Sequence, residues 1–329
     1  MANRPRHQHY SDRPEWHAYQ RFLPLSMRYT AATLPTEEWW EWRDADVHID
    51  RLPLADAPLK VLLLHGGGGN GRVLMPLGQM VHRLGYEYLA PDLPGYGLTR
   101  YGRNSRPDYG EWSRLASDLV DAEIDADGRP VVVFGLSVGG FLAYMTAARN
   151  ARVAGVIATT LLDLRRPEAR DAVARNRFLS RLGIPLGRAF RALLDPISLP
   201  MALVSKMDRI TNDPDFSRVF LRDPLAAGSR LQFRFMRSLF EAEPAVEPEE
   251  FSACPLLLAH PALDMWTPPA LSREVFDRLA CPKRYVELEG AGHFPYEQPG
   301  ATQLEEAVGA FLGELATPTD VRSPARSSL

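Results

Sequence analysis

Residues 130–141 have the sequence Pro-Val-Val-Val-Phe-Gly-Leu-Ser-Val-Gly-Gly-Phe, in which an apolar run leads into a glycine-rich turn around one serine. The run consists of β-branched and aromatic residues, which is typical of a short buried strand. Residues 135–139 then fit the G-x-S-x-G motif, in which a strand turns sharply into a helix, here over 140–149. Gly135 and Gly139 remove the Cβ atoms that would clash at such a bend. We therefore expect Ser137 in a strained turn, its Oγ exposed at a helix N-terminus that favours negative charge.

A base is the first thing that a catalytic serine requires, because a serine hydroxyl is a poor nucleophile at neutral pH. Small residues also gather at the ordinary strand–helix turns of nucleotide-binding folds, so the turn alone does not decide between the two interpretations. Of the eight histidines, His293 is best placed, because it follows the last predicted strand in a glycine-flanked loop. His260 ends another predicted strand and is a secondary candidate. His65 opens a glycine-rich loop, where we expect it to brace the backbone.

An acidic group must orient the base, and two aspartates are candidates for this role. Asp264 lies on the loop after the predicted strand 255–259, in the chain order Ser, Asp, His that is typical of proteins with a catalytic G-x-S-x-G turn. Asp163 follows the preceding strand, 153–158, and could also reach the base. We favour Asp264.

Apolar runs alternate with helical patterns along most of the chain. Strands are predicted at 47–52 (a half-exposed edge strand), 61–64, 86–90, 131–134, 153–158, 255–259 and 284–288, and helices at 73–84, 112–124, 140–149, 269–279 and 303–315. This alternation predicts βαβ units and a mostly parallel central sheet flanked by helices, an α/β fold. Such sheets bind ligands at the carboxyl ends of their strands, where both the glycine-rich loop and Ser137 fall.

The domain organisation follows from the places where the alternation breaks. We expect a core formed by residues 47–163 and 251–316, with a lead-in over 1–46 that packs on the core and a flexible tail over 317–329. The segment 164–250 lacks good strand runs and is predicted to be an inserted helical cap. Its many arginines could attract an anionic substrate, but we favour the interpretation that they lie on solvated helix faces. They are Arg165, Arg166, Arg170, Arg175, Arg177, Arg181, Arg188 and Arg191.

Composition and motifs limit the classes of function. The chain has 329 residues, a net charge of −3 and only two cysteines, which gives no case for nucleic acid, a disulfide scaffold or a thiolate zinc site. No apolar run approaches the ~18 residues that span a bilayer, and no secretory signal is seen, so we expect a cytoplasmic protein without stable membrane insertion. No phosphate-binding or dinucleotide motif is complete, so we expect a small-molecule substrate and neither cofactor nor metal. The oligomeric state is open; a homodimer would use the tryptophans near Trp39.

Five motifs in order resemble the α/β-hydrolase superfamily, over roughly residues 47–315. They are His65-Gly-Gly-Gly, Asp92-Leu-Pro-Gly-Tyr-Gly97, Gly135-Leu-Ser-Val-Gly139, the Asp264 loop and Gly290-Ala-Gly-His-Phe-Pro-Tyr-Glu-Gln-Pro299. The likeness is closest to capped serine hydrolases such as monoacylglycerol lipases, carboxylesterases and prolyl aminopeptidases. Two features depart from the family pattern: His260-Pro261 replaces the usual His-Gly, and the glycine-rich loop has four glycines.

The resemblance implies a catalytic triad of Ser137, Asp264 and His293. The oxyanion would be bound by the N–H of Val138 and by one from Gly67 or Gly68, and Asp92 would have a structural role only. The implied activity is hydrolysis of a medium-chain ester or monoglyceride through an acyl-enzyme. Alternatives are an amide hydrolase of the prolyl aminopeptidase type, using an acidic cap residue among Glu241, Glu243 and Glu247, a lactone or carbon–carbon hydrolase, and a non-enzymatic ligand-binding module.

Overall fold

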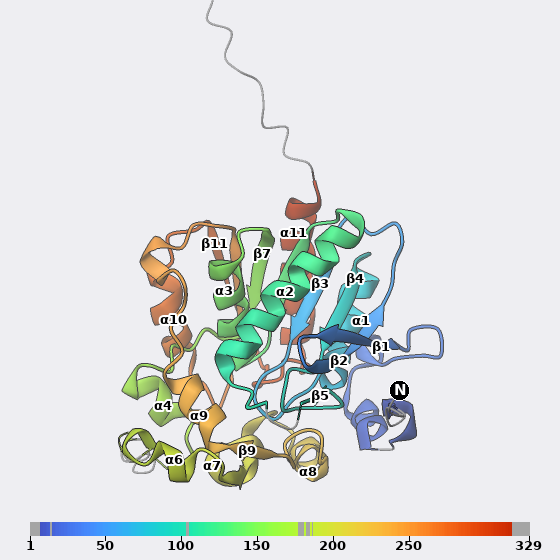
Figure 1. Cartoon of the computed structure of the whole chain (residues 1–329). Helices are drawn as coiled ribbons and strands as arrows, with labels where there is room; N and C mark the ends of the chain where they lie inside the picture. The colour runs from blue at the N-terminus through green and yellow to red at the C-terminus, as the bar shows by residue number, and fades with distance from the viewer. Residues whose placement is uncertain are drawn as a thin grey trace, which may run out of the picture.

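A central sheet of nine strands organises the computed structural model, which describes residues 7–13, 15–102, 105–176, 181, 185 and 187–317 (Figure 1). Eight strands follow one another across the sheet in the order β1 (Thr36–Trp42), β2 (Ala45–Leu52), β4 (Glu87–Pro91), β3 (Lys60–Leu64), β6 (Val131–Gly135), β7 (Val153–Ala158), β10 (Leu256–Pro261) and β11 (Lys283–Leu288). From β4 to β11 all neighbours are parallel, whereas β1, β2 and the short β5 (Arg100–Tyr101) pair antiparallel. The mostly parallel sheet expected from the sequence is confirmed.

Helices cover both faces of the sheet. The long flanking helices are α1 (Met75–Arg83, preceded by the 3₁₀ turn η4, Arg72–Leu74), α2 (Tyr109–Asp127), α3 (Val138–Arg149), α10 (Pro269–Arg278) and α11 (Gly300–Ala316). α3 packs against β6 and β7, and α2 packs against α3 (Figure 1). α1 and α11 contact each other; α1 packs against β4, and α11 packs against β7, β10 and β11. Every residue of β3 and β6 is therefore buried, as parallel strands covered on both faces must be. No helix in the described residues is both long and apolar enough to cross a bilayer.

The lead-in contributes a strand, which corrects one expectation. The predicted edge strand at 47–52 is part of β2, which lies between β1 and β4, and β1 forms the edge instead. The error has a physical cause. The polar residues that alternate along β2 suggested a solvent-exposed face, yet His48 and Asp50 are only 0% and 1% exposed. Before β1 lie three 3₁₀ helices, η1 (Tyr10–Asp12), η2 (Glu15–Phe22) and η3 (Leu25–Met27). The first two place aromatic side chains in the main hydrophobic cluster, and η3 contributes Met27.

The segment 164–250 gathers at one end of the sheet (Figure 1). Its described elements are α4 (Pro167–Val173), α6 (Arg191–Leu194), α7 (Met201–Val204), η5 (Met207–Arg209), α8 (Pro214–Arg222), α9 (Phe233–Phe240) and η6 (Pro248–Glu250). It also holds a two-stranded antiparallel pair, β8 (Ser198–Pro200) and β9 (Arg230–Gln232), which the sequence did not indicate because three-residue strands carry no readable alternation. Arg177 and the tail beyond residue 317 lie outside the described residues.

A buried network of charges ties the lead-in to the sheet. The Arg72 guanidinium binds both carboxylate oxygens of Asp50 at 2.5 and 2.7 Å. His48 lies between two carboxylates, with Nδ1 3.1 Å from Asp92 and Nε2 3.1 Å from Glu37. Burial alone would lower the pKa of His48, but Asp92, Glu37 and Asp50 raise it to about 10. His48 is therefore a buried cation at neutral pH.

This network predicts a loss of stability at alkaline pH. A histidine whose pKa rises from 6.5 unfolded to about 10 folded contributes fully below pH 6.5, and its contribution is lost as pH rises toward 10. The free energy of unfolding should fall by about 3–5 kcal/mol over this window. Chemical denaturation at pH 6.5, 8 and 9.5 measures it. His48→Gln should be less stable at pH 6.5 and should lose clearly less stability up to pH 9.5; an equal slope in both proteins would contradict the assignment.

Candidate active site

Ser137 occupies the bend between β6 and α3. Its backbone has φ 60° and ψ −132°, a conformation that residues other than glycine rarely adopt. The two flanking glycines are required, because a Cβ on Gly135 would overlap the carbonyl of Gly139, and one on Gly139 would overlap the carbonyl of Leu64. The strained turn expected from the G-x-S-x-G motif is present.

Two threonines after β7 hold this turn in place, and sequence analysis missed both. The Ser137 N–H donates to Thr159 Oγ1 at 3.3 Å, and Thr160 Oγ1 donates to the Ser137 carbonyl at 2.8 Å. The same carbonyl accepts the Gly140 N–H at 2.8 Å. Both threonine side chains are fully buried. Only their position directly after a predicted strand could have indicated them.

Asp264 and His293 form a buried pair on the loops after β10 and β11. His293 Nδ1 lies 2.8 Å from Asp264 Oδ2. Asp264 Oδ1 accepts the N–H groups of Trp266 and Thr267, each at 2.8 Å, and the Thr267 hydroxyl donates to Oδ2. Burial raises the pKa of Asp264, but His293 and Thr267 outweigh it and lower the pKa to about 2. The carboxylate therefore stays ionised at neutral pH.

The second ring nitrogen of His293, Nε2, is not used by the contact with Asp264. This nitrogen is buried without a hydrogen-bond partner among the described residues. The ring packs against Trp266, with centroids 4.6 Å apart, and Trp266 lines the same cavity as Ser137. No hydrogen bond joins Ser137 to His293 in the described structure; Trp266 is the residue that contacts the imidazole and also lines the cavity of Ser137.

The rival residues have other partners. Asp163 is bound through both oxygens by Arg165, with contacts of 2.8 and 2.7 Å, and Arg165 also bridges to Glu247. His260 Nδ1 is 3.0 Å from the carbonyl of Pro261, and burial lowers the pKa of His260. Neither residue therefore forms the carboxylate–imidazole pair that Asp264 and His293 form.

The glycine-rich loop after β3 approaches Ser137 closely. A Cβ on Gly66 would come within 2.7 Å of the Ser137 Cβ, and Gly67 lines the cavity. His65 braces the loop as expected, with Nδ1 2.8 Å from the Gly66 carbonyl and Nε2 accepting the Leu93 N–H at 3.0 Å. Burial lowers the pKa of His65 to about 4, so this ring is neutral.

Asp92 has the structural position expected for it. One carboxylate oxygen accepts the Gly71 N–H at 2.7 Å and the other accepts the Leu98 N–H, also at 2.7 Å. It therefore joins the loop after β4 to the glycine-rich loop. The Tyr10 hydroxyl donates to the same carboxylate at 3.0 Å, which extends the network into the lead-in.

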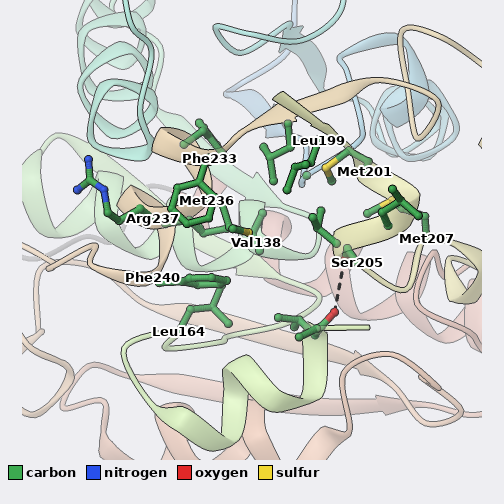
Figure 2. A pocket seen from close by; sticks show the side chains of 18 of the residues that line it. Val138, Leu164, Leu199, Met201, Ser205, Met207, Phe233, Met236, Arg237 and Phe240 are labelled. Atoms are coloured by element: carbon green, nitrogen blue, oxygen red, sulfur yellow. Dashed lines mark hydrogen bonds between the residues drawn. The ribbon is translucent and has the colours of Figure 1, made fainter. Parts of the chain in front are cut away.

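An apolar cavity of about 210 Å³ opens on Ser137 (Figure 2). This exceeds the ~150 Å³ cavity that holds benzene in an engineered protein. Figure 2 shows aliphatic, aromatic and methionine side chains around it, most from the segment 164–250. They include Leu164, Val173, Leu199, Met201, Leu203, Val204, Met207, Leu231, Phe233, Phe235, Met236, Leu239 and Phe240. The site therefore combines the strained Ser137 turn with an apolar binding space.

One group of potential metal ligands lies outside this site. Glu37, His48 and Asp50 place ligand atoms within 4.8 Å of one another. The Arg72 guanidinium already binds Asp50 and lies 3.4 Å from Glu37, so a protein cation occupies the position that a metal would need. These residues form part of the structural network described above.

Comparison with known proteins identifies the class. A soluble variant of the monoglyceride lipase of Saccharomyces cerevisiae superposes with a TM-score of 0.70, at 17% identity, over 88% of this chain and 98% of that chain, which shows the α/β-hydrolase fold. The family model for the alpha/beta hydrolase family matches residues 61–303. The chain belongs to this family.

Curated relatives lie within the same family. One is the pimeloyl-[acyl-carrier protein] methyl ester esterase of Xanthomonas oryzae pv. oryzae (strain MAFF 311018), 37% identical over 153 residues. That match covers 45% of this chain, and the chain spans about half (54%) of the relative's length. The esterase of the same name from Xanthomonas axonopodis pv. citri is 28% identical over 291 residues, covering 82% of this chain and 100% of the relative.

Proposed function

We propose that this protein hydrolyses a carboxylic ester through an acyl-enzyme formed on Ser137. The observation that carries the proposal is the buried Asp264–His293 pair, in which Nε2 has no hydrogen-bond partner among the described residues. The imidazole packs against Trp266, and Trp266 and the strained Ser137 line the same cavity. A base that is oriented by a carboxylate and has an unpaired second nitrogen is what activation of a serine requires. The names of the curated relatives, which are ester hydrolases, point to the same class.

The proposed reaction has two steps. His293 Nε2 takes the Ser137 proton as Oγ attacks the ester carbonyl, and then protonates the leaving alcohol. Water attacks the acyl-enzyme in the second step, with His293 again as base. Asp264 holds the Nδ1–H tautomer and stabilises the imidazolium that forms in each step.

Two backbone N–H groups are proposed to bind the oxyanion, those of Val138 and Gly67. Val138 is the first residue of α3, so its N–H has no partner within the helix. Of the two glycines left open by the sequence, we assign Gly67, because it lines the cavity, whereas the Gly68 N–H interacts with the Tyr96 hydroxyl. Loss of one such donor typically lowers the rate by ~10²–10³-fold.

The cavity favours an ester with an apolar chain over the amino-terminal amide of a prolyl aminopeptidase substrate. Such an amine would need a carboxylate in the cavity, and no acidic side chain lines it among the described residues. Glu241 binds Arg188 and Arg237, and Glu247 binds Arg165, so neither is available for a substrate amine. We propose that the segment 164–250 is a cap that supplies most of this apolar wall.

A labelling experiment and a substrate panel test this function together. A fluorophosphonate probe should label the protein at Ser137, and p-nitrophenyl esters of medium chain length should be hydrolysed while proline p-nitroanilide is not. An unlabelled serine would favour the ligand-binding module. Labelling together with faster turnover of the anilide than of the esters would favour the amide hydrolase, because an esterase should prefer the esters.

A further inference from the structure

One end of the apolar cavity is formed by an arginine. Arg237, on α9, is the only charged side chain among the described residues that line the cavity. In Figure 2 it lies at the left end of the labelled side chains, with its guanidinium pointing away from them, while Met207 lies toward the opposite end. The aliphatic stem of Arg237 therefore faces the apolar space and its charge does not.

The guanidinium is held on the far side by two carboxylates. Arg237 Nε and an Nη bind the two oxygens of Asp195, at 3.1 and 2.7 Å, and the other Nη binds Glu241 at 3.0 Å. The side chains of Arg237, Asp195 and Glu241 are only 20–26% exposed. Because a paired arginine–carboxylate fork is geometrically restrained, the stem is held in one position.

A second, polar cavity lies beyond this arginine. Arg237 lines it too, together with Asp195 and Glu241, and so does Arg234 on the same helix. Arg149 and Arg191 also line it, and no ion pair involves either one within the described residues. Arg237 is thus a side chain shared by the two cavities, one apolar and one rich in guanidinium groups.

We propose that Arg237 closes the apolar cavity and thereby restricts the site to acyl chains that end in a methyl group and fit inside this wall. The inference rests on the proposed esterase function and specifies its substrate class. A terminal carboxylate would lie in the apolar space without a free cation, because the Arg237 charge is already paired, and burying an unpaired charge is strongly unfavourable. A chain that is too long would have to displace the ion-paired stem.

Three variants distinguish the steric effect of the Arg237 side chain from the effect of its charge. Arg237→Ala removes the stem and joins the two cavities, Arg237→Met keeps an unbranched stem without charge, and Arg234→Ala removes a neighbouring arginine that lines only the polar cavity. For wild type, kcat/KM on p-nitrophenyl esters should rise by about fourfold per methylene, the transfer contribution of a buried methylene, up to a limiting length and then fall. Arg237→Met and Arg234→Ala should keep this limit. Arg237→Ala should shift it to longer chains and raise the activity on ω-carboxylated esters at least tenfold.

A binding measurement makes the inference independent of turnover. In the Ser137→Ala background, fatty acids of graded length and the matching dicarboxylic acids compete with a fluorescent fatty acid. The Ser137→Ala protein should bind monocarboxylic acids at least tenfold more tightly than dicarboxylic acids. Adding Arg237→Ala should reduce this difference in affinity and shift the preference to longer chains. If the wild-type protein hydrolyses no ester but the binding pattern is observed, the proposed function fails, while the inference that Arg237 closes the cavity is supported. If Arg237→Ala keeps the wild-type limit of chain length and the discrimination against dicarboxylic acids, while its melting temperature shows that it is folded, then Arg237 does not close the cavity.

Discussion

Replacing Ser137 with alanine is expected to lower kcat on a p-nitrophenyl ester by at least about 10⁴-fold, with little change in KM. The reason is that the hydroxyl is the proposed site of acylation, whereas the cavity that binds the chain and the backbone donors of Val138 and Gly67 is unchanged. Stopped assays at substrate concentrations above and below KM separate the two parameters. A variant that retains more than a few per cent of the wild-type kcat would remove Ser137 from the mechanism.

The same position offers a control for folding. Ser137 has φ 60°, so alanine keeps the backbone strain, whereas Ser137→Gly relieves it. Both variants should be inactive, and the glycine variant should be more stable than the alanine variant by about 1 kcal/mol. Urea denaturation measures this difference. Equal stability would show that the turn is strained less than its backbone angles indicate, while the loss of activity in a folded protein would still assign the nucleophile.

The strands and helices of the core were predictable because each carries a local pattern. The apolar run before Ser137 and the glycines around it specify a strand, a bend and a helix within twelve residues, and the structure places β6 and α3 there. The placement of β2 was not predictable, because His48 and Asp50 are polar residues buried by partners distant in the sequence. Arg72 and Asp92 supply those partners, and only the folded chain brings them together.

In the candidate site, too, residues with a local sequence pattern were predictable, and residues defined by contacts in the folded chain were not. The G-x-S-x-G motif indicated Ser137. The positions of Asp264 and His293 on loops after predicted strands indicated these two, because loops after parallel strands open at the same edge of the sheet. Thr160 and Thr267 carry no motif that sets them apart from other threonines after strands. Likewise, the proposed role of Arg237 depends on Asp195, which lies 42 positions away, directly after α6, and binds the guanidinium.

Replacing Asp264 with asparagine is expected to lower kcat by about 10³–10⁴-fold, because it reverses the tautomer of His293. The backbone N–H groups of Trp266 and Thr267 both donate to Oδ1, so the asparagine carbonyl oxygen must take that position. The amide NH₂ then faces Nδ1 of His293 and donates to it. The proton of the neutral imidazole is thereby placed on Nε2, the atom proposed to accept the Ser137 proton, so the proposed base is disabled while the geometry is kept.

Asp163→Asn is the matched control, since it removes the charge of the rival acid on a neighbouring loop. Its carboxylate is bound by Arg165 instead of a histidine, so activity should stay within about threefold of wild type. Thr267→Val should have an intermediate effect, a loss of about tenfold, because it removes one of two donors to Asp264 Oδ2 and leaves the hydrogen bond with His293 in place. Steady-state kinetics of the three variants on one ester give the order of effects. If Asp163→Asn lost more activity than Asp264→Asn, the acid would have to be reassigned, because the Nδ1 tautomer would then be set by a residue that the imidazole does not contact in this structure.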